Sequence, residues 1–476
     1  MKKLLFTLVV ALPMTLLGQN GYEIKITFKP FKKQYIYLGH YFGKTYPIID
    51  SALLNEKSEA VFKGDKKLQG GIYLVGYPGK TGFFEILVDK QQRFSVIADT
   101  LTIAKGAQFI NSADNVLFTS YQQFMTEKGK KIATLRQQMS GANSSDSASL
   151  AAQIQKEDIA VTKYRDDIIK TKPDNILTAL LASMREPELT GTLKNPVTKD
   201  DSLKAYSYFK SHFFDGVNFW DGRLAYTPFF EDKIDKYFEQ LVVPQPDSVI
   251  KELDWMLGTA SINEEMTRFL LIKFVNRYLT QKYMWEDMIF VHLFEKYFAN
   301  KNYTWLNEQG RKTITDRAYS LMSNIMGTPA ANIELPDSTN KKISLYDVKA
   351  DYIVVAFWDP TCGHCKEVLP KLDSFYRAKW KGMNLKMYAV AKETEGTRND
   401  WLKVINEHDL AGWSHVYYTK VADKARTDAN IPGYSQLYDV QTFPTLYLLD
   451  KEKRIIAKKL SYQQIDEVLK LKMKGQ

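Results

Sequence analysis

The stretch YIVVAFWDPTCGHC, residues 352–365, decides the fold of the C-terminal third of the chain. Its first seven residues, Tyr352 to Trp358, form an uninterrupted apolar run, which is typical of a parallel strand buried on both faces. The run ends in Asp359-Pro360-Thr361, and the residues after Cys365 have a helical pattern. The sequence therefore predicts a strand, a short turn and a helix whose first turn carries Cys362 and Cys365.

The spacing of the two cysteines suits reversible disulfide chemistry. A cysteine at a helix start lies beside unpaired backbone N–H groups and the positive end of the helix dipole, which favours the thiolate of Cys362. Two intervening residues let Cys365 reach Cys362 across one helical turn, so a mixed disulfide formed at Cys362 can be resolved internally. His364 adds a positive partner when protonated, which makes the pair more oxidising. We expect Cys362 and Cys365 to be catalytic, supported by Gly363, His364 and Trp358.

Other uses of this motif fit the sequence less well. The chain has only 2 cysteines, which excludes a Cys-rich zinc protein and a disulfide-stapled scaffold. A structural bridge across so short a loop would stabilise little, and haem attachment needs a histidine where Lys366 stands. The pattern around Cys362 also differs from that of a peroxidase. No resident metal or other cofactor is expected, but one alternative stays open: thiolate binding of Cu(I) for delivery, assisted by His364 or His415.

The sequence after the motif continues an α/β pattern. Residues 385–391 predict the next parallel strand, and residues 439–450 place Pro444 at the mouth of an apolar strand. A proline in that position predicts a special backbone, a cis Phe443–Pro444 bond. A last strand at 454–457 and a helix from about Ser461 complete the segment.

Residues 326–476 resemble the TlpA/ResA-like branch of thioredoxin-fold thiol–disulfide oxidoreductases. The resemblance is carried by the cysteine motif, Phe357-Trp358, Phe443-Pro444-Thr445 and the insertion-like stretch near 392–412. It implies an α/β thioredoxin fold in which Cys362 attacks and Cys365 resolves. It also implies that Phe443 and the cis-proline Pro444 bind substrate, with Pro444 keeping metals off the thiols.

Two positions depart from this family's pattern. Ala356 stands six residues before Cys362, where classical thioredoxins carry a buried aspartate, so either a proton acceptor for Cys365 comes from elsewhere or the resolving step relies on water. His364 replaces proline in the middle of the motif, as in oxidase- or isomerase-like members. The direction of electron flow therefore stays open.

The first residues carry an export pattern. Lys2 and Lys3 precede an apolar run over 4–12, which predicts a secretory signal peptide over residues 1–19, cleaved near Gly18 or Gln19. The run is shorter than the roughly 20 residues of a membrane span. No cysteine is present there to carry a lipid. We therefore expect a periplasmic protein that is not a lipoprotein and has no membrane span after cleavage.

Two further domains are expected between the signal peptide and residue 326. Residues 20–111 contain short apolar runs separated by turn signals, which predict an antiparallel β sandwich or barrel. Residues 112–325 predict an all-α domain that begins with a helical hairpin around the polar loop 140–147. Further helices are expected near 175–185, 202–214, 228–242, 246–257, 262–280 and 285–298.

Both of these domains also resemble known segments. Two domains of unknown function precede thioredoxin-like domains in exported proteins of Gram-negative bacteria. The first is resembled by the stretches 50–52 and 60–64, and the second by the stretches 219–224 and 285–293. The resemblance implies an architecture without any chemistry. The dense aromatics of the helical domain are interpreted as core. Restricting substrate access and forming a homo-oligomer are roles that stay open for residues 20–325.

The composition excludes several classes of protein and gives no sign of a nucleic-acid partner. Apolar residues make up 45% and charged residues 25%, which excludes a mostly disordered chain and a polytopic membrane protein. A net charge of +10 over 476 residues is a weak bias that gives no reason to expect nucleic-acid binding. The expected partners are protein thiols or disulfides and a redox partner protein.

Overall fold

The computed structural model describes residues 21–141 and 143–474, which form two compact units. The first unit holds the residues up to Val242 together with Asp254–Leu270, and the second holds Val243–Leu253 and the chain from Leu271 onward. The signal peptide expected over 1–19 lies outside the described residues. In the part of the chain that the structure describes, no helix is both long and apolar enough to cross a membrane.

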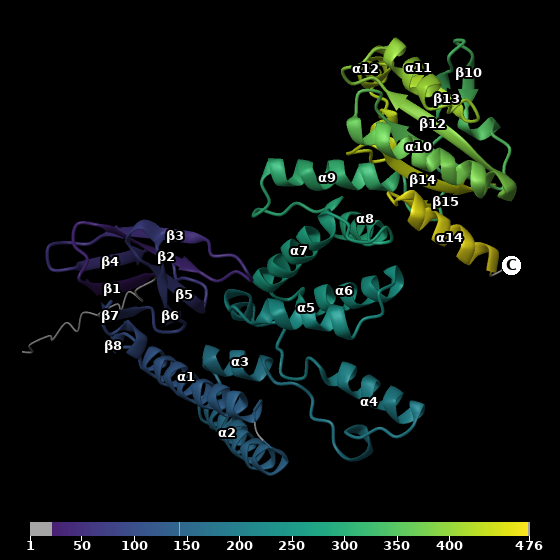
Figure 1. Ribbon diagram of the computed structural model, residues 1–476. Helices are drawn as coiled ribbons and strands as arrows, with labels where there is room; N and C mark the ends of the chain where they lie inside the picture. Colours follow the sequence, from purple (N-terminus) through teal and green to yellow (C-terminus); the bar gives the residue numbers. More distant parts are fainter. Residues whose placement is uncertain (1–20, 142, 475–476) are drawn as a thin grey trace, which may run out of the picture. The chain divides into compact units, whose positions relative to one another are not determined.

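The N-terminal domain consists of two four-stranded sheets, with strand orders β4-β1-β7-β8 and β3-β2-β5-β6 (Figure 1). Inward-facing side chains such as Ile24, Phe28, Phe62 and Val96 form one core, because alternate residues of each strand point the same way. The strands are β1 (Tyr22–Lys29), β2 (Tyr35–His40), β3 (Ile48–Leu53), β4 (Glu59–Gly64), β5 (Gly71–Gly76), β6 (Phe83–Val88), β7 (Arg93–Asp99) and β8 (Gln108–Ile110).

The strand-rich domain is confirmed, but its first sheet is mixed instead of purely antiparallel. β1 runs parallel to β7, with Ile24 opposite Phe94 and Phe28 opposite Ala98. The other strand pairs of the domain are antiparallel. Alternation of apolar residues predicts that a segment is a strand but carries no information about which distant strand lies beside it. The antiparallel expectation was wrong for that pair.

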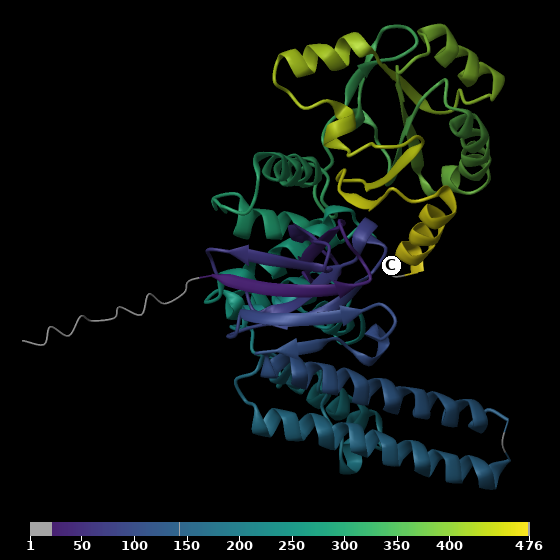
Figure 2. The ribbon, with the colours of Figure 1, turned by 90° about the vertical axis from the view of Figure 1, so that its left-hand side faces the viewer.

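Helices follow the sandwich, as expected. α1 (Ala113–Met139) and α2 (Ser144–Thr171) are the long hairpin that the sequence predicts, and Figure 2 shows them side by side. The other helices are α3 (Ile176–Ser183), α4 (Lys199–His212), α5 (Phe230–Gln240), α6 (Pro246–Ala260), α7 (Glu264–Leu279), α8 (Asp287–Leu293), a π-helical turn (Phe294–Phe298) and α9 (Glu308–Met322). Sequence reasoning missed α9.

The C-terminal domain is built on a five-stranded sheet in the order β13-β12-β11-β14-β15. The central strand β11 (Tyr352–Trp358) pairs parallel with β12 (Leu385–Lys392) and antiparallel with β14 (Thr445–Asp450). The remaining elements are β9 (Glu334–Pro336), β10 (Lys342–Ser344), α10 (Gly363–Ala378), α11 (Arg398–Glu407), β13 (Ser414–Tyr418), α12 (Lys420–Asp428), α13 (Tyr434–Leu437), β15 (Ile455–Lys458) and α14 (Tyr462–Lys474).

The apolar run of β11 is buried on both faces of this sheet. Val354, Ala356 and Trp358 belong to a core that also contains buried residues of α10, α11 and α14. Ile353 and Phe357 point into a second core, which includes residues of the lead-in segment and of α13. Because both faces are covered, the strand is continuously apolar, and its carboxyl end delivers the chain to the cysteine motif.

Candidate active site

The turn between β11 and α10 is fixed by Asp359. One carboxylate oxygen of this buried residue accepts hydrogen bonds from the backbone N–H and the Oγ1 hydroxyl of Thr361, at 2.7 and 2.8 Å. The other oxygen accepts a hydrogen bond from the Thr394 hydroxyl. The backbone carbonyl of Asp359 also accepts from the N–H of Cys362 at 3.1 Å. Asp359 thereby sets where the first cysteine emerges from the sheet.

Cys362 is the residue that caps α10. Its sulfur accepts a hydrogen bond from the backbone N–H of Cys365 at 3.4 Å, so it occupies the place of an N-cap oxygen. Both cysteines are free thiols, and Cys362 is partly exposed. A thiol at this position is available to a substrate sulfur.

Cys365 has the opposite environment. It is 0% exposed and belongs to the same core as Trp358 and Leu369. Burial raises the pKa of the Cys365 thiol well above its ordinary value, and the neighbouring Cys362 thiol adds to the rise. The pair therefore combines one reachable sulfur with one that is shielded and held as a thiol.

The cis-proline turn faces the exposed sulfur. The Phe443–Pro444 peptide bond is cis, as the sequence predicts. The Cys362 sulfur lies 3.8 Å from the carbonyl oxygen of Phe443. These two residues, 81 positions apart in the chain, meet because β14, which follows Pro444, pairs directly with β11.

A groove of about 540 Å³ begins beside this turn. Pro444 and His364 line it together, so the cis-proline and the variable middle of the cysteine motif share one surface. The other lining residues are Val368, Lys371, Asp439, Gln441, Thr442, Thr445, Leu446, Lys459, Leu460, Ser461, Tyr462 and Gln463. The groove is open and partly apolar, which suits a segment of polypeptide.

The predicted supporting residues take different positions. Gly363 is the first residue of α10, and His364 is exposed and lines the groove. Trp358 is fully buried on β11 and supports the motif from below by packing in the core around Cys365. Phe443 is partly buried and packs against the cores on both faces of the sheet.

The residues proposed for copper are not gathered at the thiols. A ring nitrogen of His415 is 2.8 Å from the backbone carbonyl of Leu410, and its ring stacks on Trp413. Burial lowers the pKa of His415. Within residues 21–141 and 143–474, no group of three or more His, Cys, Asp or Glu side chains could hold a metal ion. His364, the other histidine considered for copper, lies between the two cysteines in the sequence and lines the groove.

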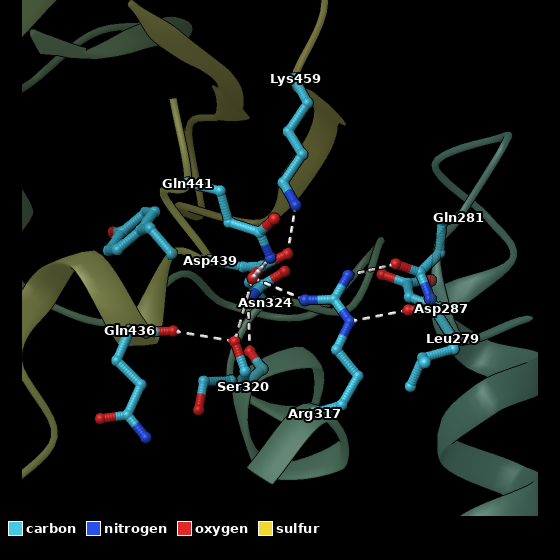
Figure 3. Close-up of polar contacts among 12 residues, drawn as sticks. Leu279, Gln281, Asp287, Arg317, Ser320, Asn324, Gln436, Asp439, Gln441 and Lys459 are labelled. Atoms are coloured by element: carbon cyan, nitrogen blue, oxygen red, sulfur yellow. Dashed lines mark hydrogen bonds and ion pairs between the residues drawn. The ribbon is translucent and has the colours of Figure 1, made fainter. Parts of the chain in front are cut away.

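Sequence reasoning did not find the polar residues around the site. Asp359 follows a buried strand directly, and a polar residue at that edge was a usable signal. Asp439, Arg317 and Lys459 come from segments far apart in the chain, and no local pattern connects them (Figure 3).

Comparisons with known proteins agree with this geometry. Residues 326–458 match the AhpC/TSA family, and residues 166–323 match a domain of unknown function, DUF5106. The thiol-disulfide oxidoreductase ResA of Bacillus cereus is 27% identical over 144 residues, which are 30% of this chain and 74% of ResA. The C-terminal domain has a thioredoxin-like fold and is similar in sequence to thiol-disulfide oxidoreductase ResA.

Further similarities fall on the same thioredoxin-like domain and beyond it. ResA of Bacillus subtilis is 27% identical over 130 residues, 27% of this chain and 64% of that protein. The crystal structure of a thioredoxin-like protein from Bacteroides caccae is 22% identical and covers 60% of this chain and 98% of its own, with a TM-score of 0.45. The three-part architecture of a strand-rich domain, a helical region and a thioredoxin-like domain is confirmed.

Proposed function

We propose that the protein exchanges disulfides with protein substrates through Cys362 and Cys365. The observation that carries the proposal is the difference between the two thiols: Cys362 is partly exposed beside a substrate-sized groove, and Cys365 is buried behind it. A reachable sulfur reacts with a partner, and a shielded one reacts only within the protein. Division into an attacking and a resolving cysteine follows from that difference.

The exchange takes two steps. In reduction of a substrate, the Cys362 thiolate attacks one sulfur of the substrate disulfide, whose S–S bond breaks as a mixed disulfide forms. The released substrate thiolate takes up a proton. Cys365 then loses its proton and attacks the Cys362 sulfur, which frees the second substrate thiol and leaves Cys362–Cys365 oxidised. Two electrons pass to the substrate, and the reverse sequence oxidises a dithiol.

Reduction of insulin by the two cysteine variants tests the proposal. We expect Cys362→Ser to lose the activity, because the buried Cys365 cannot reach a protein disulfide. Cys365→Ser should lose turnover but still form mixed disulfides. Val421→Ser, at an exposed position of α12 in the same domain, serves as a control that keeps full activity. Full insulin reduction by Cys362→Ser would overturn the proposal.

The site is proposed to work in the periplasm. The support is the export pattern of residues 1–19, with its lysines and short apolar run. Mass spectrometry of the N-terminus after expression in a Gram-negative host tests this. A mature chain that begins near residue 19 or 20 in the periplasmic fraction is expected, and an intact Met1 confined to the cytosol would contradict export.

The direction of electron flow is set by the reduction potential of the Cys362–Cys365 pair. A value near that of thioredoxin, about −270 mV, indicates a reductase, and one near about −120 mV indicates an oxidant. Equilibration in glutathione buffers gives the value directly.

A further inference from the structure

Asp439 is the centre of a buried polar cluster next to the proposed substrate groove (Figure 3). Its side chain is 3% exposed. One carboxylate oxygen accepts hydrogen bonds from Arg317 at 2.6 Å, Gln441 at 3.0 Å and Ser320 at 3.1 Å. The other oxygen is paired with the ammonium group of Lys459. A buried carboxylate with these partners is held in one position, because both of its oxygens accept charge-assisted hydrogen bonds from groups on different segments of the chain.

Arg317 lies on α9, upstream of the thioredoxin-like domain and within the DUF5106 match. Its Nε donates to the backbone carbonyl of Leu279 at 3.0 Å, and one Nη donates to the side chain of Gln281. The second Nη binds Asp439, so both ends of the guanidinium fork are used. All these residues belong to the second compact unit. The contacts with Leu279 and Gln281 thereby fix the orientation of the planar guanidinium group that binds Asp439.

Asp439 lines the groove and is bonded to two of its other lining residues. Its backbone is left-handed, with φ of 44°, and Phe443, whose carbonyl faces the Cys362 sulfur, follows four residues later. Gln441 and Lys459, both bonded to Asp439, line the groove on two different segments of the chain. The carboxylate therefore ties two walls of the groove to each other, and Arg317 ties it to α9.

We propose that Arg317 is a positioning residue for thiol–disulfide exchange, holding the segment from Asp439 to Pro444 in the place where it receives a polypeptide substrate. The inference rests on the proposed function. Arg317 does not touch the sulfurs, and the contacts of Cys362 with Cys365 and with the turn after β11 do not involve it. It acts on the binding of a polypeptide beside Cys362 and leaves the reactivity of the sulfur itself unchanged.

The test compares a polypeptide substrate with a small one. For Arg317→Ala we expect KM for insulin to rise about tenfold with kcat little changed, since binding is lost more than chemistry. The rate of reaction of reduced protein with the small disulfide DTNB should stay within about twofold of wild type. Arg317→Lys keeps the charge and should recover part of the loss. Hydrogen exchange in peptides covering 439–446 should become faster in Arg317→Ala.

Arg311→Ala is the matched control. Arg311 is on the same helix and donates to Lys301 and Asn302, outside the Asp439 cluster. Equal KM values for insulin in the Arg317 and Arg311 variants, or equal losses with insulin and DTNB in Arg317→Ala, would overturn the inference.

If Arg317→Ala does not fold, Arg317→Lys decides: a raised KM for insulin with unchanged DTNB reaction supports the inference, and an unchanged KM overturns it. Wild-type protein that fails to reduce insulin contradicts the proposed function, and exchange at 439–446 still tests whether Arg317 holds the segment.

Discussion

Cys365 and Cys362 differ in exposure because of their places on α10. Cys365 points into the core, and Cys362 caps the N-terminal end of the helix. Three residues along an α-helix return to nearly the same face, so Cys365 lies below Cys362 and against the core around Trp358. Ala356, in place of the aspartate expected in classical thioredoxins, also belongs to this core. The buried thiol therefore has an apolar floor, and burial is the main cause of its raised pKa.

This raised pKa predicts how the two thiols react as pH changes. Iodoacetamide should alkylate Cys362 alone between about pH 6 and about pH 9, because Cys365 is both shielded and held protonated. Folding raises the pKa of Cys365 above its ordinary value of 9.0, so the stability that this thiol contributes is complete below that pH and is lost as the pH rises further. Peptide mapping after alkylation shows which cysteine has reacted. Denaturant unfolding of the reduced protein at several pH values measures the change in stability. Alkylation of Cys365 in folded protein at neutral pH would contradict the account.

β15 and α8 are joined by a buried ion pair. The Lys458 ammonium is paired with Asp287 and also donates to the backbone and side-chain oxygens of Asn324, at 2.6 and 2.7 Å. The side chains of Lys458 and Asp287 are 4% and 1% exposed. Every donor of the ammonium group is used, which is the condition under which a buried charge is tolerated.

Removing one partner of this pair should be costly. We expect Asp287→Ala to lower the free energy of unfolding by about 3–5 kcal/mol, because it leaves the Lys458 charge buried without a partner. Asp287→Ala combined with Lys458→Met should recover most of the loss, since neither charge then remains. Urea unfolding followed by tryptophan fluorescence measures both. The control is Asp316→Ala, which breaks an exposed pair with Lys312 on α9 and should change stability little. A double variant no more stable than Asp287→Ala would contradict this explanation.

Local signals explain which elements the sequence could predict. The β11–α10 unit was predicted well because its strand, turn and helix start all lie within residues 352–372. α9 was missed because only Ile314, Ala318 and Leu321 of its residues are buried, so its apolar face is short. β3 has no such local signal, because its residues are mostly exposed and lack the alternation of a half-buried strand.

The residues of the candidate site also fall into those that a local sequence signal predicts and those that it does not. The cysteines, Pro444 and the cis bond follow from short motifs that any reader of the sequence can find. The partners of Asp439 cannot be found in this way: Arg317 is 122 residues away along the chain. Charged residues at the protein surface are common, and this arginine differs from the others through its contact with Asp439, which exists only in the folded chain.

The whole chain has no cysteine outside the motif. The first compact unit, with the β sandwich and the α1–α2 hairpin, therefore has no thiol, and Cys362 and Cys365 both lie in the second. Thiol–disulfide exchange can therefore take place only in the second unit. Any response of the first unit to the state of these two cysteines would have to be transmitted from there.

Hydrogen exchange in the oxidised and reduced proteins tests whether such a response exists. We expect changes in peptides that contain residues 359–372 and 439–446, because they surround the sulfurs and the cis-proline turn. Peptides from β1–β8 and from α1–α2 should exchange at the same rates in both forms. Redox-dependent exchange in the sandwich strands would show that the first unit responds to the state of the cysteines.

The most direct measurement is the site of the mixed disulfide. Cys365→Ser and Cys362→Ser are each mixed, in reduced form, with a peptide disulfide, and the adducts are mapped by mass spectrometry. A lasting peptide adduct on Cys362 in Cys365→Ser, and none on Cys365 in Cys362→Ser, is the predicted result, because only Cys362 is reachable at the end of α10. Adducts of equal yield on both cysteines, or on Cys365 alone, would contradict the account.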